Sequence, residues 1–154
     1  MATTNLVTSN GMTLPLRKWS PQGEPEAMIL ALHGFNDYSN AFSNPAEYWA
    51  KEGFLVYAYD QRGFGATSGA GRWPGTGVLM QDLLGMVALL RKIHPKIPLY
   101  LLGESMGGAL LIATSHHLPT ETISGIILVA PAVWARKTMP PMYIATLWLG
   151  AHIM

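Results

Sequence analysis

Short runs of apolar residues recur along the chain, each bounded by turn-forming or polar residues. An unbroken apolar run of this length is typical of a strand that is buried on both faces of a sheet. The pattern predicts buried strands at Ala27–Leu32, Phe54–Tyr59, Leu99–Leu102 and Ile126–Val129.

Between these runs the spacing of apolar residues changes to that of helices. Apolar residues three or four positions apart predict an amphipathic helix over Val78–His94, which Pro95 ends. Shorter helices are predicted over Pro45–Glu52 and over Met106–His117. The strands therefore alternate with helices along the chain.

The chain opens with a different pattern. Asn5–Thr8 and Leu14–Ser20 are predicted as short strands of a hairpin that turns at Asn10-Gly11. Together with the alternating elements that follow, this predicts an α/β fold. We expect a mainly parallel sheet with helices on both faces and the hairpin as an antiparallel edge.

Composition narrows the possible functions. Hydrophobic residues make up 49% of the chain and charged residues 12%, whereas charged residues average about 25% in soluble domains. We therefore expect either that a missing part covers much of the surface, or that the chain functions near lipid. A formal net charge of +1 gives no reason to expect nucleic acid or an acidic partner. Without cysteine, and without histidine pairs supported by carboxylates, neither a metal nor another cofactor is expected.

The two ends of the chain add expectations about location. Residues 1–11 lack the basic and apolar regions of a secretory signal, so we expect a cytoplasmic protein. The uncharged stretch Met139–Met154 has 16 residues, fewer than the ~20 that span a bilayer. It is interpreted as a lid helix, an interfacial helix in contact with a membrane, or the start of a longer element. Because it ends without a stop signal, the chain is expected to be incomplete.

The strongest chemical signal is Gly103-Glu104-Ser105-Met106-Gly107, between a predicted strand and a predicted helix. A serine on such a sharp turn is the nucleophile elbow of serine hydrolases. Its backbone is strained, and the residues two before and two after it crowd one another, which favours glycine at both places. We interpret Ser105 as the nucleophile, and Gly108 as a position where the helix approaches its neighbouring strands closely.

A second signal follows the first buried strand, at His33-Gly34-Phe35. Acyl transfer needs two backbone N–H donors for the oxyanion. One is expected from Met106, the residue after the nucleophile, and the other from Phe35 in this loop. His33 is interpreted as a structural hydrogen-bonding residue and not as the catalytic base.

The remaining acids and histidines are assigned structural roles. Asp60, after the second buried strand, is expected to accept backbone hydrogen bonds from its turn, with Arg62 tying the loop down. Asp82 is interpreted as a surface residue and His94 as a solvated helix cap. The other histidines lie far along the Ser105 helix, roughly 16–18 Å from its start, or in the C-terminal stretch; they are His116, His117 and His152.

Three motifs occur in a fixed order: His33-Gly34, Asp60-x-Arg62-Gly63-x-Gly65 and Gly103-x-Ser105-x-Gly107-Gly108. In combination they resemble the monoacylglycerol lipase and lysophospholipase branch of the α/β-hydrolases, also labelled serine aminopeptidase-like. The resemblance implies an α/β-hydrolase fold, a nucleophile at Ser105 and oxyanion donors at Phe35 and Met106. It also implies a lid after the fourth buried strand. Residues 1–138 are accordingly assigned to the core domain, and residues 139–154 to the start of the lid or cap.

The sequence departs from this family pattern after the nucleophile. In the family the catalytic acid and then the histidine follow the serine, but after Ser105 the only acid is Glu121. The last two strands of the usual sheet are also absent. A smaller departure is Thr67, where the family usually has serine. The fold is therefore expected to be truncated before its last strands.

Two classes of function stay open. The resemblance implies hydrolysis of carboxylic esters with apolar acyl groups, of monoacylglycerol or lysophospholipid type, through an acyl-enzyme on Ser105. Amide or peptide hydrolysis uses the same groups and is the alternative within this class. The other class is a non-catalytic fragment, or half of a split enzyme that binds a complementary C-terminal half carrying the acid and base. A coding sequence that continues with an aspartate and then a histidine would discriminate between them.

Overall fold

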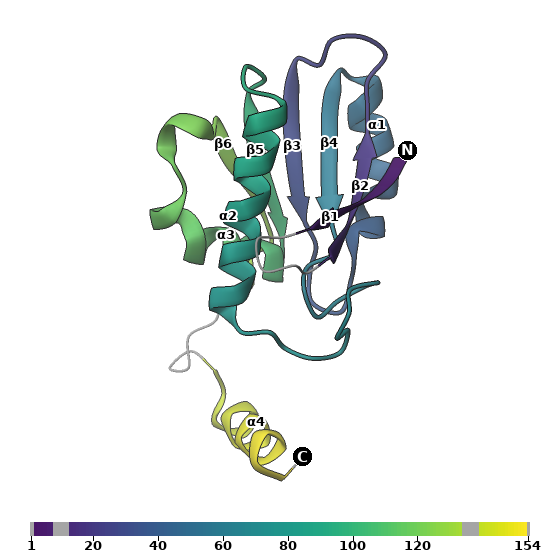
Figure 1. Cartoon of the computed structure of the whole chain (residues 1–154). Helices are drawn as coiled ribbons and strands as arrows, with labels where there is room; N and C mark the ends of the chain where they lie inside the picture. The colour runs from purple at the N-terminus through teal and green to yellow at the C-terminus, as the bar shows by residue number, and fades with distance from the viewer. Residues whose placement is uncertain (1, 8–12, 134–138, 154) are drawn as a thin grey trace.

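The computed structural model describes residues 2–7, 13–133 and 139–153 (Figure 1). Its centre is a six-stranded sheet in the order β1-β2-β4-β3-β5-β6. The strands are β1 (Ala2–Val7), β2 (Thr13–Trp19), β3 (Ala27–Leu32), β4 (Phe54–Tyr59), β5 (Leu99–Glu104) and β6 (Gly125–Val129).

The direction of the strands confirms the prediction of a mainly parallel sheet. β4, β3, β5 and β6 pair in parallel, whereas β1 and β2 pair antiparallel with each other and β2 pairs antiparallel with β4. The hairpin is thus the antiparallel edge that was expected. The turn predicted at Asn10-Gly11 lies outside the described residues.

The central strands are apolar at every position because both of their faces are covered. Along β3, Met28 and Leu30 belong to one core cluster, whereas Ile29 and Ala31 belong to the other. This alternation is the period of two that a pleated strand imposes on its side chains.

Helices cover the two faces of the sheet (Figure 1). On one face lie the short 3-10 helix η1 (Ser39–Phe42) and α1 (Ser43–Lys51), with Phe42 and Ala46 in the core. On the other face lie α2 (Thr76–Ile93) and α3 (Met106–Thr114). The prediction of helices on both faces is confirmed.

The helix expected over Met106–His117 is α-helical only to Thr114. Its end forms the 3-10 turn η2 (Ser115–His117), followed by η3 (Thr120–Thr122) before β6. The hydroxyl of Thr114 donates to the Leu110 carbonyl at 2.7 Å and that of Ser115 to the Ile112 carbonyl at 2.8 Å. Such bonds compete with the helical ladder, and Pro119 cannot continue a helix.

β6 is the edge strand opposite β1 and pairs only with β5 among the described strands. Its residues Ile126, Ile127, Leu128 and Val129 are each 41–44% exposed. Successive side chains of a strand point to opposite faces, so both faces of β6 are partly exposed. Its outer edge has no partner strand among the described residues.

Beyond this sheet, α4 (Pro141–Ile153) lies apart from the rest of the molecule (Figure 1). It carries exposed apolar side chains, which are Met142, Tyr143, Leu147, Trp148 and Leu149. In the described part of the chain no helix combines the length and apolar character needed to cross a membrane. The assignment of this segment to a lid stays a prediction.

Candidate active site

Ser105 stands at the junction of β5 and α3 in a strained backbone conformation. Its φ of 50° and ψ of −110° lie where non-glycine residues are rare. Backbone hydrogen bonds hold this conformation. The Ser105 N–H donates to the Val129 carbonyl at 2.9 Å, and the Ser105 carbonyl accepts from the N–H groups of Ala109 and Ala132, both at 3.0 Å. The sharp turn predicted for Ser105 is confirmed.

The glycines around Ser105 permit this turn. A Cβ on Gly103 would lie 2.6 Å from the backbone carbon and oxygen of Gly107, as the crowding argument predicts. A Cβ on Gly107 would instead strike the backbone of Leu32 at the end of β3. One on Gly108 would lie 2.9 Å from Pro131, so Gly108 allows the predicted close approach of α3.

The loop after β3 lies beside Ser105. A Cβ on Gly34 would lie 3.4 Å from the Cβ of Ser105 and would collide with the carboxylate of Glu104. Sequence reasoning did not single out Glu104 as a charge in the site. Its place between the elbow glycine and the serine is the signal that could have drawn attention to it.

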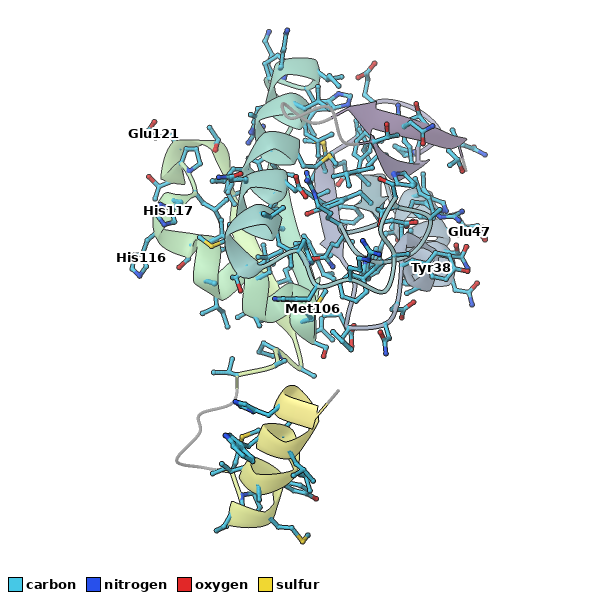
Figure 2. All side chains as sticks on the ribbon, turned by 60° about the horizontal axis from the view of Figure 1, so that its bottom comes forward. Tyr38, Glu47, Met106, His116, His117 and Glu121 are labelled. Carbon is cyan, nitrogen blue, oxygen red and sulfur yellow. The ribbon has the colours of Figure 1, made fainter. Side chains whose placement is uncertain are left out.

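Two backbone amides flank Ser105 without an acceptor. Among the described residues no group accepts a hydrogen bond from the N–H of Phe35 or of Met106. Met106 is the first residue of α3, where the helix dipole favours negative charge, and Figure 2 marks its position. Phe35 directly follows Gly34, which lies beside Ser105, and Met106 directly follows Ser105.

His33 is fully buried below this loop, and both ring nitrogens are engaged. Its Nδ1 lies 2.8 Å from the Gly34 carbonyl oxygen, and its Nε2 lies 3.0 Å from the Gln61 backbone nitrogen. Burial lowers the pKa of the His33 imidazole, although the bond to Gly34 and the charge of Asp60 act in the opposite direction. A neutral ring with no free nitrogen is a structural hydrogen-bonding group and not a general base.

Asp60 has the role predicted for it. One of its carboxylate oxygens accepts from the Ser39 backbone N–H at 2.9 Å and from the Ser39 hydroxyl at 2.5 Å. The other accepts from the Ala66 N–H at 2.9 Å. Asp60 thereby joins the loop after β4 to η1.

Arg62 ties the same loop to α2, as predicted, but the prediction that Asp82 is a surface residue is wrong. Arg62 donates from Nε at 2.9 Å and from Nη2 at 2.7 Å to the two carboxylate oxygens of Asp82. Asp82 is 4% exposed. It shares the buried face of α2 with Leu79 and Met86, at the helical spacings of three and four residues.

The remaining histidines lie away from Ser105. His116 and His117, with Glu121, project from the edge of the molecule beyond α3, far from Met106 (Figure 2). His94 closes α2 and its Nε2 lies 2.9 Å from the Tyr57 hydroxyl. His152 belongs to α4 and stacks on Trp148. None of these described histidines is placed to act as a base for Ser105, and no cluster of three metal-ligating side chains occurs among the described residues.

Comparisons with known proteins identify the family to which this chain is similar. A family model described as serine aminopeptidase, S33 matches residues 23–154. The monoglyceride lipase of Rattus norvegicus is 35% identical over 133 residues, which cover 86% of this chain and 44% of that protein. The monoacylglycerol lipase of Mycolicibacterium smegmatis is 29% identical over 136 residues, with coverage of 88% and 48%.

Solved structures share the fold at lower identity. A carboxyl esterase from Bacillus coagulans has a TM-score of 0.71 at 23% identity, covering 82% of this chain and 43% of that one. The α/β hydrolase GrgF from a Penicillium species has a TM-score of 0.78 at 22% identity, covering 98% and 52%. These likenesses confirm the predicted α/β-hydrolase fold. The chain spans about half the length of the proteins that it matches.

Proposed function

The chain belongs to the serine aminopeptidase S33 family, and from that membership we propose that it forms the nucleophile-bearing part of a carboxylic ester hydrolase. The observation that supports this most directly is the strained Ser105 together with two unengaged amides. One belongs to Met106, the next residue, and the other to Phe35 in the loop beside Ser105.

The chemistry of the proposed site follows from these groups. The Ser105 hydroxyl attacks the ester carbonyl, and the carbonyl oxygen becomes an oxyanion held by the two amides. The oxyanion collapses, the alcohol leaves, and the acyl group stays on Ser105 until water releases it. Each oxyanion donor contributes on the order of 10²–10³ in rate in serine hydrolases.

This chemistry needs a base that takes the proton of Ser105, and an acid that orients that base. Among the described residues, His33 is the histidine nearest the site, and both of its ring nitrogens are occupied. We therefore place the base and acid on a complementary C-terminal half that is not within residues 1–154. The chain without that half is expected to be a non-catalytic fragment.

The uncovered strand β6 is where the complementary half would dock. Its free edge offers unpaired backbone groups, and its exposed residues 126–129 are all apolar. Such an edge accepts a further strand readily. Strands supplied there would cover β6, and its last residue Val129 already holds the Ser105 amide.

The substrate class is proposed from two exposed apolar surfaces, one beside Ser105 and the other on α4. Phe35 is 62% exposed beside Ser105, and α4 presents Trp148 and Leu149 at 55% and 52% exposure. We propose that α4 begins a lid along which an apolar acyl chain enters, and that this lid contacts lipid surfaces. Relatives named monoglyceride lipase and monoacylglycerol lipase favour a monoacylglycerol over a lysophospholipid. The family name keeps amide or peptide hydrolysis as the alternative within the class.

The proposal is tested on two proteins. One is the chain of residues 1–154 alone, and the other, called the completed protein below, is this chain fused to the C-terminal half of the rat monoglyceride lipase. Each is incubated with a fluorophosphonate and with a monoacylglycerol, and labelling is located by mass spectrometry. We expect rapid labelling of Ser105 and ester hydrolysis in the completed protein only. Labelling of a different residue would contradict the assignment of Ser105, and hydrolysis of a peptide amide in preference to the ester would favour the alternative.

A further inference from the structure

Gln61 is fully buried at the end of β4 and makes two hydrogen bonds to one residue of the neighbouring strand end. Its backbone N–H donates to Nε2 of His33 at 3.0 Å, and its side-chain Nε2 donates to the His33 carbonyl at 2.8 Å. The two residues are 28 positions apart in sequence. Gln61 therefore fixes both the ring and the backbone of His33.

The first of these bonds decides which ring nitrogen of His33 carries hydrogen. A backbone amide can only donate, so Nε2 must be the acceptor and the hydrogen must be on Nδ1. That hydrogen points to the Gly34 carbonyl oxygen, 2.8 Å away. Free histidine side chains prefer the hydrogen on Nε2, so the site imposes the less common tautomer.

The bond from His33 to Gly34 in turn orients the next amide. In a trans peptide the N–H points opposite to the preceding carbonyl. Because the Gly34 carbonyl is held toward the His33 ring, the N–H of Phe35 is turned away from the ring. This leaves the Phe35 amide without an acceptor among the described residues, in the loop that lies beside Ser105.

The Gln61 side chain contributes to this arrangement at the expense of its own hydrogen bonding. Its Oε1 is buried and has no partner among the described residues. Turning the amide over would place Oε1 against the His33 carbonyl oxygen, and two acceptors repel. A buried unpaired acceptor is uncommon in proteins, so the side chain makes its bond to the His33 carbonyl at a cost in its own hydrogen bonding.

We propose that Gln61 is a positioning residue for the oxyanion loop. Its side-chain amide holds the His33 carbonyl and so keeps the His33 ring where the Gln61 backbone N–H donates to Nε2. The Nδ1–H tautomer that results turns the Phe35 amide toward Ser105. This inference rests on the proposed function of the Phe35 amide as an oxyanion donor. Gln61 does not touch the substrate in this arrangement, and it acts only through His33.

The test compares Gln61→Met with Thr114→Val. Methionine keeps the length of the side chain and the backbone N–H of residue 61 but cannot donate to the His33 carbonyl. The variant therefore tests whether the side chain is needed to keep the His33 ring on that N–H. Thr114→Val also removes one buried hydrogen bond, at the far end of α3, and so controls for lost stability alone. In the completed protein, in which β6 would be covered, the ring nitrogens of His33 are observed by long-range ¹H–¹⁵N NMR. We expect the Nδ1–H form in the wild type and in Thr114→Val, and a shift toward the Nε2–H form in Gln61→Met. An unchanged ring spectrum in Gln61→Met would overturn the proposal.

The kinetic arm uses the completed protein. Gln61→Met is expected to lower kcat for ester hydrolysis roughly 10–100-fold at unchanged KM, part of the ~10²–10³-fold that loss of a whole oxyanion donor costs. Thr114→Val should keep the wild-type kcat. A Gln61→Met protein with wild-type kcat would overturn the positioning role, while loss of turnover in Ser105→Ala would still support the proposed function. Turnover that persists in Ser105→Ala would contradict the proposed function. The NMR spectrum of the His33 ring would still decide whether the Gln61 side chain controls the tautomer of His33.

Discussion

The backbone N–H of Ser105 donates a hydrogen bond of 2.9 Å to the carbonyl oxygen of Val129, the last residue of β6. The strained residue that we propose as the nucleophile is therefore tied to the strand whose outer edge is open. The geometry of the elbow and the integrity of β6 depend on each other, and the first prediction concerns that strand.

The chain alone is expected to self-associate through β6, because an uncovered apolar edge pairs with other chains. Ile127→Lys places a charge on this strand and should raise the monomeric fraction in size-exclusion chromatography. The matched control is Ile112→Lys on α3, since Ile112 is 41% exposed and Ile127 is 42% exposed. A wild-type chain that is already monomeric, or equal effects of the two variants, would show that the edge does not drive association.

Gly107→Ala is expected to destabilise the chain by about 3 kcal/mol, because its Cβ would overlap the backbone of Leu32. The control is Gly85→Ala in α2, where a Cβ would meet nothing within 4 Å. That change should stabilise the chain by about 0.5–1 kcal/mol through helix propensity. Urea unfolding in the Ile127→Lys background measures both. Similar stability of the two variants would contradict the close contact between Gly107 and β3.

The buried pair of Arg62 and Asp82 predicts a large cost when one partner is removed alone. Asp82→Leu removes the carboxylate from the Arg62 guanidinium, whose side chain is 14% exposed, and should cost about 3 kcal/mol in the free energy of unfolding. The double change Arg62→Met with Asp82→Leu should cost clearly less, since no charge is then left behind. Strict additivity in this double-mutant cycle would mean that the ion pair does not couple the loop to α2.

The buried imidazole of His33 predicts how stability depends on pH. Burial lowers its pKa in the folded chain, whereas in the unfolded chain it stays near 6.5. As pH falls below about 6.5, the unfolded chain binds the proton first, so the free energy of unfolding decreases until the folded pKa is passed. Unfolding in urea from about pH 7.5 to about pH 5 should show this loss. His33→Gln should reduce the dependence of the free energy of unfolding on pH. An unchanged dependence would contradict the assignment of this loss to the buried imidazole of His33.

Much of the fold could be predicted because its signals are local. Each central strand is an apolar run that both faces of the sheet require, so β3 and β4 were predicted with their observed bounds. Ser105 was identifiable because the strained turn demands Gly103 nearby in sequence. The end of α3 was missed because the hydroxyl of Thr114 and the path to Pro119 decide it.

What could not be predicted depends on contacts between distant residues. The helical spacing of Asp82 from its apolar neighbours places it on the buried face of α2. Its partner Arg62 is 20 residues away in sequence, so no local pattern indicates the ion pair that lets Asp82 be buried. Gln61 acts on His33 across two strand ends, and nothing local in its surroundings indicates a buried amide. The crowding of Gly107 likewise arises from Leu32, at the end of another strand, and not from its own turn.

The central claim is that Ser105 is the nucleophile of an ester hydrolase once a complementary half is supplied. It is tested most directly by kcat for monoacylglycerol hydrolysis in the completed protein, with Ser105→Ala and Ser115→Ala compared side by side. Ser115 is an exposed serine beyond the end of α3 whose hydroxyl already donates to the Ile112 carbonyl. We predict that Ser105→Ala lowers kcat by about 10⁴–10⁶ and that Ser115→Ala leaves it unchanged. Equal losses from the two changes, or turnover that persists in Ser105→Ala, would contradict the claim.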